Sequence, residues 1–298
     1  MNAILSYIKE NPQKTQRLLR LKYEQLQELL KNAERLHQEK QAEGEAKKIR
    51  IIASGGGRQS KLSVEEQIIL TLVYLRHLTT FQLLGIQFDV SESTANDTFN
   101  YWFPLLQELL PASLLEQVKK NISDEEMVKE ILTEYELIVD SEEQLRERPG
   151  EYKEQNKYYS GKQKKHTFKN QIVVMPKGED IVDVMAGEPG PKSDNKLFQQ
   201  RQTKFDPQQK FQGDKAYQGE KGMRTPKKKP SKRELTVLEK QKNKEMAQDR
   251  IFVEHVIRLL KIFRVAAERF RLKPGKYERI IMTICGLVRL RIGALVLP

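Results

Sequence analysis

The sequence predicts an α/β protein in which a helical module precedes a domain of strands and helices. Residues 61–110 contain short apolar segments, each preceded by a helix-capping residue, as in a small helical bundle. Strand-like apolar segments follow at residues 134–140, 165–175, 180–186 and 210–213. An amphipathic segment at 234–271 and an apolar segment at 277–297 predict two further helices.

Length, charge and cysteine content narrow the class of protein. With 298 residues the chain can form one large domain and a smaller module. Its net charge of +12 favours a polyanionic partner, since cationic side chains bind phosphates and release counterions. Cys285 is the single cysteine, which excludes an intramolecular disulfide and a cysteine-rich zinc site. No run approaches the ~18 apolar residues of a membrane span, and the N-terminus lacks a signal-peptide pattern, so a cytoplasmic location is expected.

Residues 13–46 are expected to form one charged helix. Its apolar face comprises Leu19, Tyr23, Leu26, Leu30, Ala33 and His37. This face can pack on its own domain or form a dimeric coiled coil. The first alternative is favoured because the stripe is shorter than the three to four heptads, roughly, that a coiled coil needs. Residues 54–60 are polar and glycine-rich, which predicts a linker or a phosphate-binding loop.

The helical module has the element order of a helix-turn-helix. Ser63 and Glu66 form a capping box at the start of its first helix. The second helix is expected to stop near Gly85, and Ser91 caps a third over residues 92–110. An ordinary three-helix bundle is the alternative. In a helix-turn-helix the start of the last helix enters the major groove, and here it would present Ser91, Ser93, Thr94 and Asn96.

Three acidic residues are candidates for a metal site. Asp140 ends the apolar run 135–139, Asp214 follows the segment 211–213, and Glu254 lies in the amphipathic helix. Carboxylates are the ligands that hard divalent cations prefer, and two such ions can promote phosphodiester chemistry. Taken singly, each acid has an alternative role, such as a turn former for the aspartates or an i,i+4 ion pair between Arg250 and Glu254.

Basic segments flank these acids. Residues 155–178 contain six lysines and no acid, and residues 221–233 contain seven basic residues, no acid and two prolines, which predicts a loop. Contacts with DNA phosphates are expected from Arg58, Lys162, Lys164, Lys165, His166, Lys227, Lys228 and Lys229. His166 could instead simply extend the basic strand.

Residues 50–265 resemble the bacterial insertion-sequence transposases of the DDE superfamily, in the branch related to the PIF/Harbinger elements. The motifs that carry the resemblance, in chain order, are Gly55–Arg58 with Lys61–Ser63, Leu137–Asp140 with Glu143, Tyr159–Thr167, Gly213–Gly219, Thr225–Pro230, Asn243, Arg250 and Val253–Glu254. The family usually has Asp-Gly-Thr-Glu at its first acidic motif, whereas this chain has Asp140-Ser141-Glu142-Glu143. Ala216 likewise stands where glycine is commoner, and neither change removes a carboxylate ligand.

The resemblance implies an RNase H-like domain, with a central mixed sheet flanked by helices, after an all-α helix-turn-helix domain. It implies two Mg²⁺ or Mn²⁺ ions shared by Asp140, Asp214 and Glu254, while Arg250 orients a carboxylate or a phosphate. For Glu143, a supporting role and ligation stay open. The expected domains are an N-terminal helical region (1–53), the helix-turn-helix domain (54–120) and the catalytic domain (121–298).

The function implied is binding of terminal inverted repeats, metal-dependent cleavage and strand transfer into target DNA. A homodimer or higher oligomer on double-stranded DNA and a place on the bacterial nucleoid would follow. One alternative is a catalytically silent, domesticated DNA-binding protein, which the intact acidic triad argues against. The other is a nuclease for RNA–DNA hybrids, which the helix-turn-helix argues against.

Overall fold

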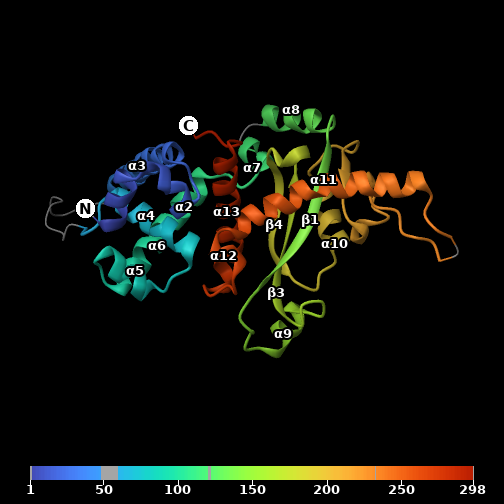
Figure 1. The fold of residues 1–298 in the computed structure, drawn as a ribbon. Helices are drawn as coiled ribbons and strands as arrows, with labels where there is room; N and C mark the ends of the chain where they lie inside the picture. Colours follow the sequence, from blue (N-terminus) through green and yellow to red (C-terminus); the bar gives the residue numbers. More distant parts are fainter. Residues whose placement is uncertain (1, 48–59, 120–121, 232, 298) are drawn as a thin grey trace. The chain divides into compact units, whose positions relative to one another are not determined.

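The computed structural model describes residues 2–47, 60–119, 122–231 and 233–297 (Figure 1). It divides into two compact units, Met1–Leu110 with Leu295–Pro298, and Pro111–Ala294. The functional division predicted at residues 53 and 120 stays a prediction. Arg58 and residues 54–59 of the predicted linker or phosphate-binding loop lie outside the described residues.

The first unit is helical. Its helices are α1 (Ala3–Glu10), α2 (Thr15–Leu19), α3 (Tyr23–Ala46), α4 (Val64–His77), α5 (Phe81–Phe88) and α6 (Glu92–Leu109), with the 3-10 turn η1 (Pro12–Lys14). The single helix predicted over 13–46 is wrong, because Arg20 adopts a left-handed conformation (φ 67°) that ends α2. Helix α3 packs on α4 and α6 and buries Leu26, Leu30 and Ala33, which confirms packing within its own domain.

Helices α4, α5 and α6 form the predicted helix-turn-helix. The capping box of Ser63 and Glu66 is present, and the Ser91 hydroxyl accepts the backbone N–H of Thr94 at the start of α6. The prediction that the second helix stops near Gly85 is wrong, because Gly85 lies inside α5. A Cβ there would come within 2.7 Å of the Val90 carbonyl oxygen, so glycine is needed for the close return of the chain.

The second unit is built on a mixed sheet. Its strands are β1 (Glu136–Leu145), β2 (Tyr159–Ser160), β3 (Lys165–Val174), β4 (Ile181–Pro189), β5 (Lys210–Gln212) and β6 (Met223–Arg224). Strand β3 lies antiparallel between β1 and β4, whereas β5 runs parallel to β1 and β6 parallel to β5. The predicted RNase H-like class, a mixed sheet flanked by helices, is confirmed.

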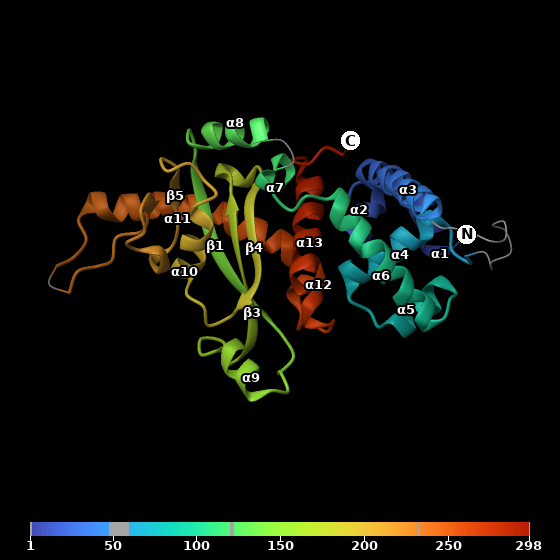
Figure 2. The ribbon, with the colours of Figure 1, turned by 180° about the vertical axis from the view of Figure 1, so that it is seen from behind.

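Helices cover both faces of this sheet. Helices α11 (Val237–Lys261) and α13 (Tyr277–Ile292) pack on β1 and β4, and α11 crosses in front of the sheet in Figure 1 and behind it in Figure 2. The other elements of this unit are α7 (Leu114–Val118), α8 (Ile122–Leu132), α9 (Tyr152–Tyr158), α10 (Asp194–Gln202), α12 (Arg264–Ala267), η2 (Pro176–Gly178), η3 (Lys215–Tyr217) and η4 (Pro274–Lys276). The single helix predicted over 234–271 is wrong, because α11 ends at Lys261 and α12 begins at Arg264. The Phe263 side chain between them is buried in the core.

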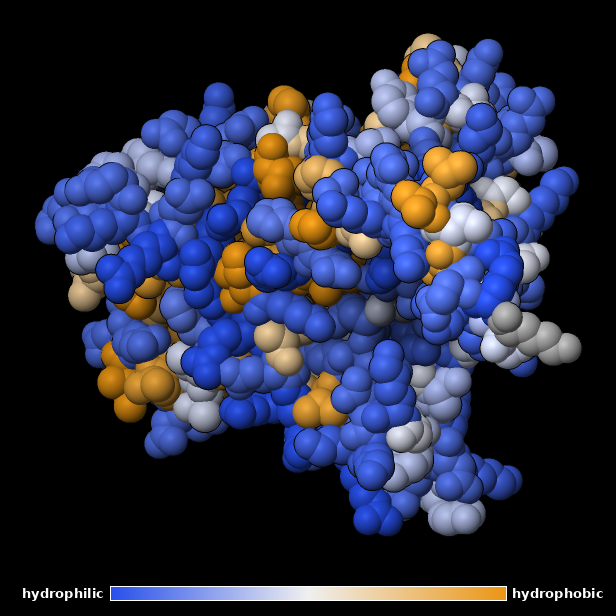
Figure 3. All heavy atoms as spheres, turned by 45° about the vertical axis from the view of Figure 1, so that its right-hand side comes forward, coloured by the Kyte–Doolittle hydropathy of each residue, from blue (hydrophilic) through white to orange (hydrophobic). Residues whose placement is uncertain are grey.

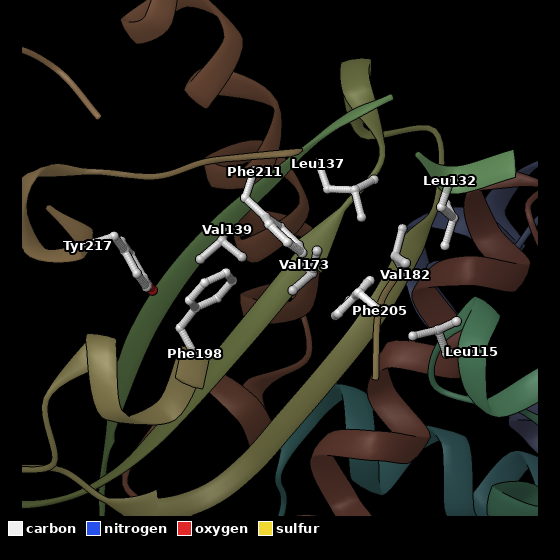
Figure 4. Close-up of a cluster of buried hydrophobic side chains, with 10 residues drawn as sticks. All are labelled: Leu115, Leu132, Leu137, Val139, Val173, Val182, Phe198, Phe205, Phe211 and Tyr217. Carbon is white, nitrogen blue, oxygen red and sulfur yellow. The ribbon is translucent and has the colours of Figure 1, made fainter. Parts of the chain in front are cut away.

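One apolar cluster fills the face of the sheet opposite α11 (Figure 4). Leu137 and Val139 of β1 meet Phe198 of α10 and Leu115 of α7 there. Because side chains alternate along a strand, Ile138 and Asp140 point to the other face. No helix in the described ranges is long and apolar enough to span a membrane.

Candidate active site

The pairing of β1 with β5 sets Asp140 and Asp214 close together. The two strands are parallel, and Ile138 lies opposite Gln212. Each aspartate follows that pair by two residues along its own chain. The prediction that the strand ends at Asp140 is wrong, because β1 continues to Leu145 through hydrogen bonds with β3. Asp214 lies just past β5, where its carboxylate accepts the Ala216 N–H at 2.7 Å.

Arg250 links Asp140 to Glu254. One guanidinium nitrogen of Arg250 lies 3.5 Å from the Asp140 carboxylate and 3.9 Å from that of Glu254, one turn further along α11. The helix docks through Val253, Val256 and Leu260, which are buried, whereas Ile257 is only half-buried. The structure therefore brings Arg250 and two of the three predicted carboxylates into direct contact.

The electrostatics of Asp140 reflect a group of like charges. Burial raises the pKa of the Asp140 carboxyl above its usual value, and the negative charges of Asp214 and Glu254 raise that pKa further. The Ser141 N–H and the Arg250 guanidinium oppose this shift. A bound cation would reverse the balance, since its positive charge favours ionised carboxylates.

The donor set fits a hard divalent cation. All three acids offer oxygen ligands, which such cations prefer. The buried Nε of Arg250 makes no hydrogen bond to any described residue, so this donor is available to an anion such as a phosphate. Within the described residues, no three acidic, histidine or cysteine side chains are already gathered at ligand distances. A magnesium site does not need such a cage, because Mg²⁺ keeps several waters and uses one or two carboxylates plus substrate phosphate.

Glu143 lies on the other face of β1 from Asp140. Its carboxylate accepts the Thr167 hydroxyl at 2.7 Å and lies 3.9 Å from the Lys169 ammonium group. Strand alternation separates it from the face that Asp140 shares with Arg250. The geometry therefore offers Glu143 a supporting role in the sheet and no place beside Asp140.

A hydrogen-bonded clasp that sequence reasoning missed joins the two aspartate segments. The buried Tyr217 hydroxyl lies 2.8 Å from the Ser141 hydroxyl and accepts the Gln171 side-chain N–H at 3.1 Å. Ser141 directly follows Asp140, and Tyr217 follows Asp214 by one 3-10 turn. Burial raises the pKa of Tyr217 far above its usual range, so the phenol stays protonated.

Gly213 makes this clasp possible. A Cβ at that position would come within 2.7 Å of the Tyr217 ring, so a larger residue would displace the ring. The sequence feature that could have pointed to this hydrogen bond is Ser141, which stands where the family usually has glycine. Serine has a hydroxyl group that can bond to Tyr217, and glycine has none. The partner of Ser141 could not be found without the pairing of β1 and β5.

In the first unit, the predicted recognition residues are exposed at the start of α6. The Ser91 hydroxyl lies within 2.9 Å of the Ser93 and Thr94 hydroxyls, and the Asn96 side chain accepts an N–H from Asn100. These exposed side chains are therefore held by local hydrogen bonds.

The predicted DNA-binding lysines of the 221–233 loop differ from one another. The Lys227 ammonium group lies 2.6 Å from Glu239, and Lys229 pairs with Glu234, whereas no ion pair of Lys228 is found in the described chain. The guanidinium of Arg233, and then Lys227, hold the pKa of Glu239 far below its usual range. Among these three lysines, Lys228 is therefore the one most available to a phosphate.

The second basic segment lies at the end of the β1–β3 hairpin. Lys162, Lys164 and Lys165 are exposed, and His166 is half-buried against the Tyr159 ring. On the face of the molecule shown in Figure 3, hydrophilic side chains dominate and apolar ones form small separate groups. Charge and hydrogen bonding are therefore the main interactions that this face offers a partner.

A mixed sheet with clustered carboxylates, together with helix-turn-helix elements, is typical of metal-dependent enzymes that act on DNA. Residues 139–289 match the sequence profile of the DDE superfamily endonucleases, and residues 60–112 match that of the helix-turn-helix of DDE superfamily endonucleases. A probable transposase for insertion sequence element IS702 from Microchaete diplosiphon is 30% identical over 235 residues, which span 78% of this chain and 82% of that protein. The chain belongs to the DDE superfamily endonucleases, as the motifs predicted.

Two solved structures are also distantly similar to this chain. A Mos1 transposase paired-end complex with left transposon end is 10% identical, covers 77% of this chain and 86% of its own, and has a TM-score of 0.20. A pre-cleavage Mos1 transpososome is 12% identical, covers 85% of this chain and 84% of its own, and has a TM-score of 0.15.

Proposed function

We propose that this protein is a DNA transposase that binds the terminal inverted repeats of an insertion sequence and cleaves and joins DNA strands. The observation that carries the proposal is the parallel pairing of β1 and β5, which sets Asp140 and Asp214 near one edge, with Arg250 between Asp140 and Glu254. Membership of the family and the transposase name of the IS702 relative support it.

In this proposal Asp140, Asp214 and Glu254 hold two Mg²⁺ or Mn²⁺ ions. When bound, the ions supply activation of the attacking oxygen and stabilisation of the leaving oxygen in an in-line displacement at phosphorus. Arg250 keeps the Asp140 and Glu254 carboxylates aligned and can turn toward a phosphate oxygen, while Tyr217 and Ser141 fix the spacing of the two aspartate segments. Hydrolysis and strand transfer use the same residues, since both are displacements at a phosphodiester.

The DNA contacts are divided between the two units. Ser91, Ser93, Thr94 and Asn96 would meet base edges in the major groove. The basic residues Arg58, Lys162, Lys164, Lys165, His166, Lys227, Lys228 and Lys229 would contact the backbone. Because two element ends must be joined, a homodimer or higher oligomer forms on DNA, and the protein is associated with the bacterial nucleoid.

The test uses a plasmid that carries the DNA flanking the gene. We expect matched inverted repeats in that DNA, Mg²⁺-dependent breaks at their outer ends, and joining of those ends to a second plasmid. Specific binding of the ends without any cleavage in Mg²⁺ or Mn²⁺ would instead support the domesticated DNA-binding protein. Cleavage of RNA–DNA hybrids in preference to duplex ends would overturn the proposal.

Recognition is tested separately. Changing Ser93, Thr94 and Asn96 to Ala should reduce discrimination between the repeat and random duplex. Lys228→Ala should weaken binding to both duplexes alike and lower the salt slope by about one unit. Lys227→Ala and Lys229→Ala are matched comparisons with smaller expected effects, because both lysines are already paired with acids. If Lys228→Ala changed the sequence preference and the Ser93, Thr94 and Asn96 variant did not, this assignment of base and backbone contacts would be wrong.

A further inference from the structure

A cationic cavity at the end of the β1–β3 hairpin lies apart from the acidic site and includes three residues already proposed to contact DNA, Lys164, Lys165 and His166. The cavity, of about 210 Å³, is called the hairpin pocket here, and its charged lining comprises Arg146, Glu147, Arg148, Lys164, Lys165 and Arg269. Among the described residues that line it, Glu147 is the single acid. Glu147 lies 3.7 Å from the Arg269 guanidinium, so four of the five cations have no ion pair in the described chain, and like charges around one small cavity repel one another.

Three of these cations are held in place by the fold. The Arg146 guanidinium lies over the Tyr158 and Phe168 rings, 4.0 and 4.5 Å from their centres. Arg148 donates to the Gln155 side chain at 2.8 Å. A backbone hydrogen bond from Phe270 to Leu145 fixes the neighbouring Arg269 beside the hairpin.

Lys164, in the turn before β3, and Lys165, the first residue of β3, complete the lining. Lys164 has a left-handed backbone (φ 52°), a strained conformation for a residue with a side chain, and such strain is commonly found at binding sites. Within the described chain, no acid pairs with Lys164 or Lys165. Burial and the charges of Arg148 and Arg146 lower the pKa of the adjacent His166, which reflects the same concentration of positive charge.

The pocket lies at the end of β1, further along the chain than Asp140. Arg146 follows Asp140 by six residues and comes directly after Leu145, the last residue of that strand. At ~3.3 Å per residue the two positions are about 20 Å apart, which is less than one turn of B-DNA, ~34 Å. A duplex with its scissile phosphate at the carboxylates can therefore present a second phosphate to the pocket.

We propose that the hairpin pocket binds one backbone phosphate of the cleaved duplex, within one helical turn of the scissile phosphate. This inference rests on the proposed function and adds Arg146, Arg148 and Arg269 to the residues that hold DNA. Its role is to set the angle at which the duplex crosses the acidic site, because two fixed phosphates define a line.

The first experiment measures affinity of the metal-free protein for random-sequence duplex over a range of salt. The test variant is Arg148→Gln with Lys165→Gln, both exposed, and the control is Lys119→Gln with Lys177→Gln, which removes the same charge. Lys177 follows the far end of β3 from the pocket. Loss of one phosphate contact should weaken binding about eightfold at ~0.1 M salt and lower the salt slope by about one unit relative to the control.

The second experiment places single neutral methylphosphonates along the element-end duplex. In the wild-type protein one position within a turn of the cut should lose affinity, and the test variant should be insensitive at that position alone. Equal salt slopes for test and control variants, or a methylphosphonate effect that persists in the test variant, would overturn the pocket. Wild-type cleavage with wild-type binding by the variant rejects the pocket only, whereas a wild-type protein that neither binds nor cleaves DNA rejects the proposed function as well.

Discussion

On β1, Asp140 and Glu142 face helix α11, whereas Ser141 and Glu143 face the side covered by α10. The first pair meets cations of one helix, since Arg250 lies 3.5 Å from Asp140 and Lys261 lies 3.0 Å from Glu142. The second pair meets hydroxyl groups, of Tyr217 and Thr167. Strand alternation thus divides the four polar residues 140–143 between two sides of the sheet. One side carries the candidate metal ligand Asp140, and the other forms hydrogen bonds that hold the strand in place.

Asp140→Asn is the strongest test of this division. It should lower Mg²⁺-dependent cleavage of an end-bearing plasmid by about a thousandfold or more, because a ligand is lost while DNA binding is kept. Because the pKa of Asp140 is raised, its contribution to stability is present at low pH and is lost as the pH rises through that pKa. The variant should therefore melt higher than wild type at neutral pH in chelator. Asp249→Asn, which changes a half-buried α11 carboxylate 3.7 Å from Arg224, is the control, and full cleavage by Asp140→Asn would remove Asp140 from the site.

Val256→Lys tests whether packing of α11 positions the metal-binding side. Val256 is buried, so an unpaired ammonium there should cost about 3 kcal/mol or more in urea unfolding and should misplace Glu254. Ile257→Lys is the matched variant, with a smaller expected cost because Ile257 is half-buried. Wild-type stability of Val256→Lys would show that α11 does not dock through this face.

Arg250→Ala separates positioning from packing. The fold should remain, while cleavage falls by roughly 10–100-fold, the range found when groups that orient metal ligands are removed. Arg250→Lys keeps the charge but not the geometry that reaches both Asp140 and Glu254, so it should restore only part of the activity. Mn²⁺ affinity, measured by electron paramagnetic resonance, should fall with cleavage, and an unchanged affinity would assign Arg250 to DNA.

Local features of the fold could be predicted from the sequence because they depend on near neighbours. The caps at Ser63 and Ser91 each need only a partner three residues away, and both are present. The strand at Asp140 was predicted too short, because the polar residues after it lack an alternating pattern and β3 supplies their pairing. The break at Arg20 was missed because a left-handed arginine has no sequence signal.

The candidate site was predictable as a set of residues but not as a geometry. The three acids came from motifs, whereas the Tyr217–Ser141 clasp depends on which strands are neighbours. The same holds for Lys227, whose pairing with Glu239 joins a loop to a helix and reduces its availability to DNA. From the sequence alone, Lys227, Lys228 and Lys229 were predicted to contact phosphates equally well.

The clasp on the supporting side is tested by a double-mutant cycle. Ser141→Ala and Tyr217→Phe should each cost ~0.5–1.5 kcal/mol in unfolding, and together little more than one of them, since both remove the same hydrogen bond. Mn²⁺ affinity should fall by at most ~10–100-fold, because the aspartates remain. Ser141→Thr keeps the hydroxyl and should retain that affinity. Additive losses would mean that the two hydroxyls act separately.

Glu143→Gln has the smallest expected effect and decides whether the two sides of β1 differ as described. The amide oxygen of glutamine can still accept the Thr167 hydroxyl, so stability should change by about 1 kcal/mol or less. Cleavage and Mn²⁺ affinity should stay within about twofold of wild type, because Glu143 lies on the opposite side from Asp140 and Arg250. Thr167→Val removes the donor and serves as the matched variant, with a loss of stability and no loss of Mn²⁺ affinity. If Glu143→Gln lost as much Mn²⁺ affinity as Asp140→Asn, Glu143 would be a metal ligand. The side of β1 on which an acid lies would then not determine whether it binds metal.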